Sequence, residues 1–215
     1  MDDDDRFPRM IRSVRQFRDR VFPEYGDDFA RLATGQDPVA LFITCADSRI
    51  SPEMITEAGP GDLFVSRNVG NLVPAYGEML GGVSAVVEFA VKALHVPHII
   101  ICGHSDCAAM KALWDPASHD LDAMPTVKSW LRNAEAASSV VRATAAHLPE
   151  AEMLAALVRQ NVALQLQHLR THPAVAAALA NRRVTLHGWV YDIGEGRIDA
   201  LREATGALGP LDDPD

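Results

Sequence analysis

One apolar run in this chain ends in three chemically reactive side chains. Residues 38–45 read PVALFITC, a short continuous run of apolar, partly branched residues that is typical of a strand buried on both faces of a parallel sheet. Cys45, Asp47 and Arg49 follow at every second position in CADSR. Charged side chains at a buried strand end are unfavourable unless they are paired or bind a metal ion. The pattern therefore indicates a binding or catalytic site at this strand end.

Strand-like and helix-like patterns alternate through the first half of the chain. Apolar runs typical of buried strands occur at 38–45, 63–71 and 98–104. Helical patterns follow them, beginning at Ser51-Pro52, at 81 and directly after His104. Because strand–helix–strand units cross over with one handedness, this order predicts an α/β fold in which a central, mainly parallel β-sheet is flanked by helices.

The second half adds helices and a C-terminal pair of strands. Two long helices are expected, from about 126 to 147 and from about 149 to 172. RVTLHGWVYDIGEGRIDAL predicts a hairpin-like strand pair that turns at 194–196.

The N-terminal region is expected to form a helical arm. Basic and apolar residues are mixed at helical spacing over 6–33, with interruptions at Pro23 and Gly26, which predicts two helices. No internal repeat or linker divides the rest of the sequence. We therefore expect one domain over 1–215, in which residues 1–35 lie on the outside or pack on a partner subunit.

Composition narrows the class of protein. The 215 residues are 48% hydrophobic, enough for one globular core, and the formal net charge of -9 argues against nucleic acid or an anionic membrane as a partner. No apolar stretch approaches the roughly 20 residues that cross a bilayer. The three cysteines and the acidic start favour a cytoplasmic protein with reduced thiols. In that compartment, cysteine together with histidine indicates metal binding or catalysis.

A second motif supplies the partners of Cys45. His104 and Cys107 follow the strand at 98–104 in GHSDC. Because ligands bind beyond the carboxyl ends of parallel strands, we expect these three side chains to meet at one edge of the sheet. Two thiolates with an imidazole select zinc.

The number of ligands distinguishes a catalytic zinc site from a structural one. Three protein ligands leave a coordination position open, whereas a structural site has four. Cys102 is the remaining thiol, but it lies a full pleat repeat behind His104 and suits a buried core position. Asp47 would then orient the nucleophile, and Arg49 would keep that carboxylate ionised and away from the metal. Asp106 is expected to be solvated, and His168 with His172 to be a helix-end or surface pair.

The combination of CADSR and GHSDC resembles the signature of the β-class carbonic anhydrases. PGDLFVSRNVGNLVP, GGVSAVVEFAV, QNVALQLQHLRTHPAV and LHGWVYDI extend the resemblance over nearly the whole chain and are similar to the plant-like bacterial branch associated with cyanate breakdown. The resemblance implies one Zn²⁺ per chain on Cys45, His104 and Cys107, with Asp47 and Arg49 as a catalytic dyad. It also implies a homodimer or higher homo-oligomer whose subunit interface contains the substrate pocket. The residues implied to line that pocket are Gln36, Phe64, Val69, Phe89 and Ala108, the last through its backbone amide.

The chain departs from the family pattern at three positions. Phe89 stands where many relatives carry tyrosine, so it keeps the apolar wall but cannot relay a proton. Ala93 replaces a histidine that some relatives have one helical turn further on. Phe42 replaces a tryptophan that helps to form an inhibitory bicarbonate site in one subgroup, so we expect that site to be absent and the dyad to stay open.

The implied reaction is the reversible hydration of carbon dioxide to bicarbonate and a proton by zinc-bound hydroxide. One alternative is a hydrolase of carbon disulfide or carbonyl sulfide on the same zinc site. Another is a non-catalytic zinc scaffold, which would need a fourth protein ligand, and Cys102 is the available thiol.

Overall fold

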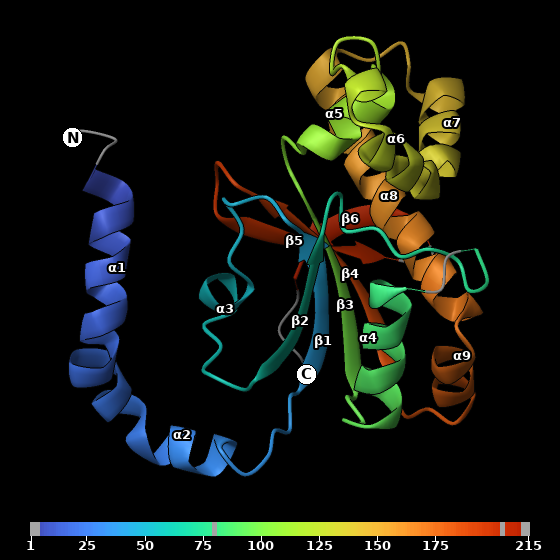
Figure 1. The fold of residues 1–215 in the computed structure, drawn as a ribbon. Coiled ribbons are helices and arrows are strands. Elements are labelled where there is room, and N and C mark those ends of the chain that lie inside the picture. Colours follow the sequence, from blue (N-terminus) through green and yellow to red (C-terminus); the bar gives the residue numbers. More distant parts are fainter. Residues whose placement is uncertain (1–4, 79–80, 203–204, 212–215) are drawn as a thin grey trace. The chain divides into compact units, whose positions relative to one another are not determined.

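The computed structural model describes residues 5–78, 81–202 and 205–211 (Figure 1). The chain forms two compact units, residues 1–37 and 38–215. The boundary lies two residues beyond the end of the expected helical arm. No described helix is long and apolar enough to cross a membrane.

The N-terminal unit is a succession of short helical segments. They are α1 (Arg6–Gln16), a π-helical turn η2 (Phe17–Val21), a 3₁₀ turn η3 (Phe22–Tyr25) and α2 (Gly26–Leu32). Pro23 lies in the 3₁₀ turn, where a proline is tolerated because the first amide of a helix has no internal acceptor. The rings of Phe22 and Phe29 stack with centroids 5.0 Å apart, but no residue among 5–37 is buried.

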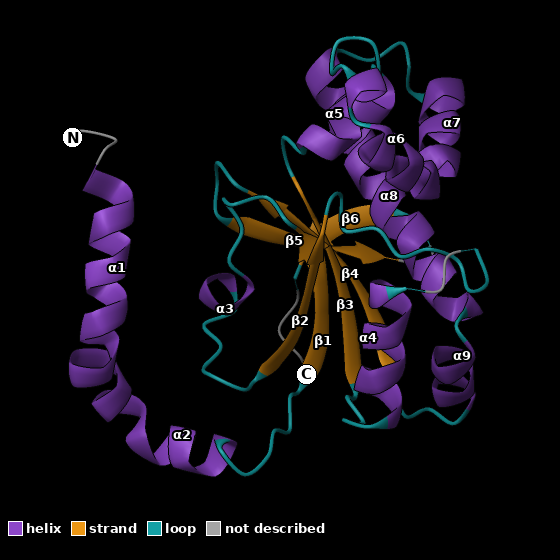
Figure 2. Ribbon diagram, in the orientation of Figure 1, coloured by secondary structure: helices purple, strands orange, loops and turns teal. Residues whose placement is uncertain are grey.

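The second unit contains a six-stranded sheet in the order β2-β1-β3-β4-β5-β6 (Figure 2). The first four strands in chain order are parallel, and β5 and β6 run antiparallel to their neighbours. Their bounds are β1 (Ala40–Cys45), β2 (Leu63–Asn68), β3 (His98–His104), β4 (Thr185–Asp192), β5 (Arg197–Arg202) and β6 (Ala207–Pro210). The predicted fold class, a mainly parallel sheet flanked by helices, is confirmed.

Helices connect the strands and extend beyond them. Their bounds are α3 (Pro52–Ile55), α4 (Gly82–Lys92), α5 (Ala108–Trp114), η4 (Leu121–Ala123), α6 (Pro125–Leu131), η5 (Arg132–Ala134), α7 (Glu135–Thr144), α8 (Glu150–Thr171) and α9 (Pro173–Ala180). The prediction of a single helix over about 126–147 is wrong, because the 3₁₀ turn η5 separates α6 from α7. At that turn the Asn133 side-chain amide donates to the carbonyl of Trp130, a local bond that competes with regular helix geometry.

The two faces of the sheet pack differently. On one face, β1 and β3 contribute Leu41, Ile43, Ile99 and Ile101 to a core shared with α4, α8 and α9. The long helix α8 lies close to β3 and β4, since Gly103 and Gly188 face it without side chains. On the other face, a smaller core contains Ala40, Phe42, Ile100 and Cys102. Both cores hold the central strands rigidly, so the carboxyl ends of β1 and β3 are fixed in space.

Candidate metal centre

Three side chains converge where β1 and β3 end. Cys45 is the last residue of β1, His104 is the last residue of β3, and Cys107 immediately precedes α5. One ligand atom from each lies within 4.8 Å of the others, and all three residues are buried. Within the described ranges, this is the one group of three or more cysteine, histidine or acidic residues that could hold a metal ion.

The imidazole of His104 is arranged as a metal ligand. Its Nδ1 lies 2.8 Å from the carbonyl oxygen of Ser105, so with the hydrogen placed on Nδ1 that atom donates to the backbone. The other nitrogen, Nε2, is buried and has no hydrogen-bond partner among the described residues. A buried unpaired nitrogen is costly, and a second bond that fixes the ring tautomer is usual for metal-ligating histidines. The donor set of His104 therefore fits a metal ion.

The two thiols differ in how readily they ionise, because the pKa of Cys45 is lowered and that of Cys107 is raised. A hydrogen bond from the Cys107 side chain, assisted by His104 and the amide of Gly70, lowers the pKa of Cys45 to about 4. The Gly70 amide donates to Cys45 Sγ at 3.4 Å. The Cys45 thiolate and burial together raise the pKa of Cys107 above its usual range. A buried anionic sulfur beside a second thiol and an unpaired imidazole nitrogen favours a bound cation.

Asp47 is turned toward Arg49. The guanidinium Nε donates to Asp47 Oδ1 at 2.9 Å and Nη2 donates to Oδ2 at 2.7 Å, while the Arg49 backbone amide donates to Oδ1 at 3.0 Å. These bonds, the side-chain ones first, hold the pKa of Asp47 well below its ordinary range. Asp47 Oδ2 lies 4.0 Å from His104 Nε2. The carboxylate is thus ionised, lies close to the three candidate ligands and is hydrogen-bonded to Arg49.

Two further residues hold this arrangement, and neither contact was predicted from the sequence. Asp106 is exposed, as expected, but it also accepts a hydrogen bond from Arg49 Nη1 at 2.9 Å and pairs with Lys111. Its backbone φ of 57° belongs to the left-handed region, which aspartate tolerates better than most residues. Arg67 donates to the carbonyl oxygens of Cys45 and Asp47 at 3.2 and 2.6 Å. The available sequence signal for Arg67 was the apolar pattern of LFVSRN, because it predicts a strand whose end lies beside the end of β1.

The remaining candidate ligands lie outside the group. Cys102 is fully buried, its thiol donates to the Gly103 carbonyl oxygen, and desolvation raises its pKa to about 12. His168 Nδ1 and His172 Nε2 lie 2.8 and 3.0 Å from the backbone carbonyl oxygens of Val73 and Pro74. The pair lies at the end of α8, as the helix-end prediction has it, but His172 is buried and not on the surface. Both rings contact the loop that precedes α4.

The residues expected to line a substrate pocket occupy several elements. The rings of Phe64 on β2 and Phe89 on α4 lie 5.9 Å apart. Phe89 and Val69 are exposed, at 50% and 39% of their surface. Ala108 begins α5 directly after Cys107 and is also exposed. Gln36 belongs to the N-terminal unit, in an exposed segment that follows α2.

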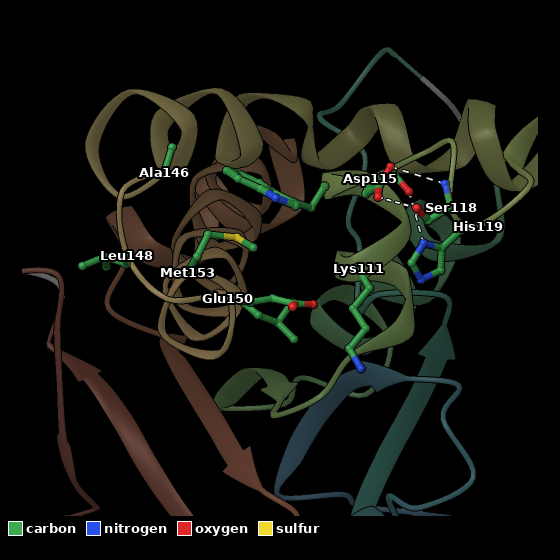
Figure 3. Close-up of a pocket in the computed structure, with 10 residues that line it drawn as sticks. Lys111, Asp115, Ser118, His119, Ala146, Leu148, Glu150 and Met153 are labelled. Carbon is green, nitrogen blue, oxygen red and sulfur yellow. Dashed lines mark hydrogen bonds between the residues drawn. The ribbon is translucent and has the colours of Figure 1, made fainter.

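A separate pocket of about 600 Å³ lies between α5, the loop that follows it and the start of α8 (Figure 3). Lys111, His119 and Glu150 contribute polar groups to its lining, and Met153 contributes an apolar one. The side chain of Lys111 links this pocket to Asp106, but none of the three converging ligands lines it.

The fold and the site together define a class of protein, an α/β protein with a candidate metal centre at the edge of its sheet. A mainly parallel α/β sheet carries a Cys–His–Cys group able to bind a metal ion at its carboxyl edge, with an arginine-held carboxylate beside it.

Comparisons with known proteins identify the family. The family model for carbonic anhydrase matches residues 40–198. A carbonic anhydrase of Pseudomonas aeruginosa is 53% identical over 196 residues, which cover 91% of this chain and 88% of the relative. The solved structure of the beta-carbonic anhydrase CcaA has a TM-score of 0.92 at 38% identity and covers 96% of this chain and 92% of its own. A solved structure from work on two tetrameric beta-carbonic anhydrases of the ascomycete Sordaria macrospora has a TM-score of 0.77 at 31% identity, covering 91% and 96%.

The chain therefore belongs to the carbonic anhydrase family, and it is an enzyme of the lyase class. The resemblance to this family stated from the sequence is confirmed, whereas the more specific likeness to the branch associated with cyanate breakdown stays a prediction.

Proposed function

We propose that this enzyme hydrates carbon dioxide reversibly, using one zinc ion held by Cys45, His104 and Cys107. The observation that carries the proposal is the buried His104 Nε2, which has no hydrogen-bond partner among the described residues, in a ring that offers a ligand atom within 4.8 Å of those of both cysteines. Two sulfur donors and one nitrogen donor suit zinc, and three protein ligands correspond to a catalytic site. When bound, zinc lowers the pKa of a water molecule and so supplies a nucleophile near neutral pH.

Asp47 orients the attacking water through one particular oxygen. Oδ1 already accepts two hydrogen bonds from Arg49, whereas Oδ2 accepts one and also lies 4.0 Å from His104 Nε2. A carboxylate oxygen has two acceptor positions, so Oδ2 retains one on the side of the ligands. Arg49 keeps the carboxylate ionised and prevents it from taking a metal position itself.

The substrate pocket is proposed to be apolar and completed by a second subunit. Phe64, Val69 and Phe89 supply an apolar wall for carbon dioxide, while the Gln36 amide and the backbone amide of Ala108 supply hydrogen-bond donors. The exposure of Val69 and Phe89 leaves that wall open to solvent in a single chain. Cover from a partner subunit would exclude water from it, and the tetrameric Sordaria macrospora enzymes supply a precedent for association.

Proton release follows from the side chains at the site. Phe89 has no hydroxyl group and Ala93 no titratable group, so neither can carry a proton away. We propose that buffer molecules and water take the proton. The enzyme is proposed to work in the cytoplasm, where the thiols of Cys45 and Cys107 remain reduced and available to the metal.

Zinc content and stopped-flow carbon dioxide hydration test the proposal together. The expected result is about one zinc per chain in both the wild type and Asp47→Ala, with hydration strongly reduced in the variant. The same assay offers carbon disulfide and carbonyl sulfide in turn. Zinc-loaded enzyme that turned over these sulfur compounds but not carbon dioxide would replace this proposal with the hydrolase alternative, and a zinc-loaded protein inactive on all three would favour a scaffold.

A further inference from the structure

Two histidines meet at the amino-terminal edge of the sheet, far from the Cys–His–Cys group. His98 is the first residue of β3, and His187 lies in β4. The parallel register pairs His98 with Thr185 and Ile100 with His187, which places both imidazoles on the same face. His104 ends the same strand six residues later, so the two places are about 20 Å apart.

The two rings present nitrogens to one another at close range. His98 Nδ1 and His187 Nε2 are 3.2 Å apart, and the ring planes are inclined by 63°. This distance is at the long end for a hydrogen bond. It matches the separation of about 3.3 Å between two imidazole nitrogens that bind one tetrahedral metal ion at roughly 2.0–2.1 Å.

The surroundings leave the pair accessible and favour the neutral form of His187, whose pKa is lowered. His98 is exposed and His187 half-buried. Burial, and then the proximity of His98, lower the pKa of His187, which favours the uncharged form that binds metals. Apart from each other, neither ring has a hydrogen-bond or ion-pair partner within the described ranges.

We propose that His98 and His187 form a second metal site, which takes a late first-row divalent cation such as Cu²⁺ or Zn²⁺. Imidazole nitrogens suit these cations, and Cu²⁺ binds most tightly among them. No carboxylate or thiolate within the described ranges joins the pair to make a group of three, so solvent fills the remaining positions. The site is independent of the proposed zinc centre, because it shares no ligand with it.

Trp189 provides a local reporter. Its ring lies 6.5 Å from that of His187. Zinc-loaded enzyme is titrated with Cu²⁺ while calorimetry measures binding and tryptophan fluorescence is recorded. We expect one additional Cu²⁺ per chain and saturable quenching at the same stoichiometry. Trp189→Phe should remove most of the quenching and leave the calorimetric affinity unchanged.

Matched variants assign the ligands. His98→Ala and His187→Ala should each weaken Cu²⁺ binding by about tenfold or more, because each removes one of two ligands. His147→Ala is the control, since His147 is also exposed and should leave the affinity unchanged. Electron paramagnetic resonance of the bound Cu²⁺ should show two nitrogen ligands in the wild type and one in each ligand variant.

The proposal is overturned if His98→Ala and the control bind Cu²⁺ as tightly as the wild type, or if the wild type binds none beyond its zinc. In either case the two imidazoles form an ordinary hydrogen bond. Because His98 is exposed, its variant should remain folded and keep its carbon dioxide hydration, so the test does not depend on the more buried His187.

Discussion

At the scale of single residues, Arg49 links Asp47, beside the proposed zinc centre, to charged side chains at the protein surface. One side of its guanidinium holds Asp47, and the other contacts Asp106, which in turn pairs with Lys111. Arg49 is 42% exposed, so no single one of these ion pairs is strong by itself. Their joint effect is geometric, because a guanidinium held from two directions has less freedom to rotate.

Asp106→Asn tests this geometric role. The substitution keeps the shape of the side chain but removes its charge, so Arg49 is held less firmly and Asp47 is less well placed. We expect kcat to fall by about fivefold, well below the roughly 100-fold that a displacement of about 1 Å can cost. Stopped-flow assays at several pH values measure it. Asp122→Asn is the control, since Asp122 pairs with Lys128 on the surface, and an equal loss in both variants would refute the role of Asp106.

The three cysteines allow a direct comparison of candidate ligand thiols with a core thiol. Cys107→Ser should lose the metal and the activity, because hydroxyl oxygen is a poor substitute for thiolate. Cys102→Ala should retain the metal and lose about 1 kcal/mol of stability, as expected for a small change in the core. Metal analysis and urea denaturation measure the two effects. Release of metal from Cys102→Ala would indicate a fourth ligand and support the scaffold reading.

The candidate ligands could be located from sequence because strand ends in a parallel sheet share one edge. That rule was sufficient to bring Cys45, His104 and Cys107 together across the chain. The contact between Asp106 and Arg49 could not be found in the same way, since it depends on a left-handed turn that directs the side chain back toward β1. Side-chain direction within a turn is a property of the folded backbone.

At the scale of elements, the packing of α8 on the sheet determines how firmly β3 is held. A Cβ atom on Gly103 would lie 2.8 Å from Val162 Cγ2 and 3.1 Å from Val158 Cγ1. These branched side chains on α8 are fully or nearly fully buried and cannot move away without disturbing the core. Gly103 also directly precedes His104, so this packing supports the candidate metal ligand.

Gly103→Ala should therefore destabilise the protein by about 1–3 kcal/mol through overpacking. The strain should also weaken zinc retention against a chelator, because β3 ends at the ligand. Urea unfolding and chelator competition measure the two effects. Gly82→Ala is the matched control, since Gly82 begins α4 and no described atom outside its chain neighbours and its own helix backbone lies within 4 Å of the added methyl group. A Gly103→Ala protein as stable as this control would contradict the packing argument.

Elements with strong periodicity were easier to predict than those defined by tertiary contacts. The strand over His98–His104 agrees with its apolar run, and the turn at 194–196 joins β4 to β5. β6 was not predicted, since a four-residue strand with two residues half-buried has little pattern of its own. Its pairing with β5, and not local propensity, defines it.

At the scale of the whole molecule, the pH dependence of activity combines the metal and its neighbours. In the proposed zinc centre, two thiolate ligands would reduce the positive charge that acidifies water, so we expect hydration to rise from about pH 7 to about pH 9. Asp47 does not cause this rise. Arg49 depresses the pKa of its carboxyl, so it is already ionised above the ordinary value of about 3.9 and loses its charge only in strong acid. A pH–rate profile that is flat from mildly acidic pH upward would contradict the prediction.

The N-terminal unit raises the question of association. Helix α1 has 11 residues, and an isolated helix of that length is marginal in water. Phe7, Met10, Ile11 and Val14 repeat at helical spacing and are exposed, with Phe7 at 66% and Val14 at 65%. Contact with a partner subunit, as expected from the sequence, would cover this stripe and give the helix the packing that it needs.

A double substitution, Phe7→Glu with Val14→Glu, tests the arm in the full-length protein. Charge on the apolar stripe should prevent its burial, so the molar mass measured by light scattering should fall to that of a smaller assembly. Activity should fall with it if a partner subunit completes the wall formed by Phe64 and Phe89. Arg15→Glu changes the charge of the same helix outside the stripe and should leave the mass unchanged. If the double variant keeps the wild-type mass, the arm does not hold the subunits together, and the exposed wall at Phe89 must be covered in another way.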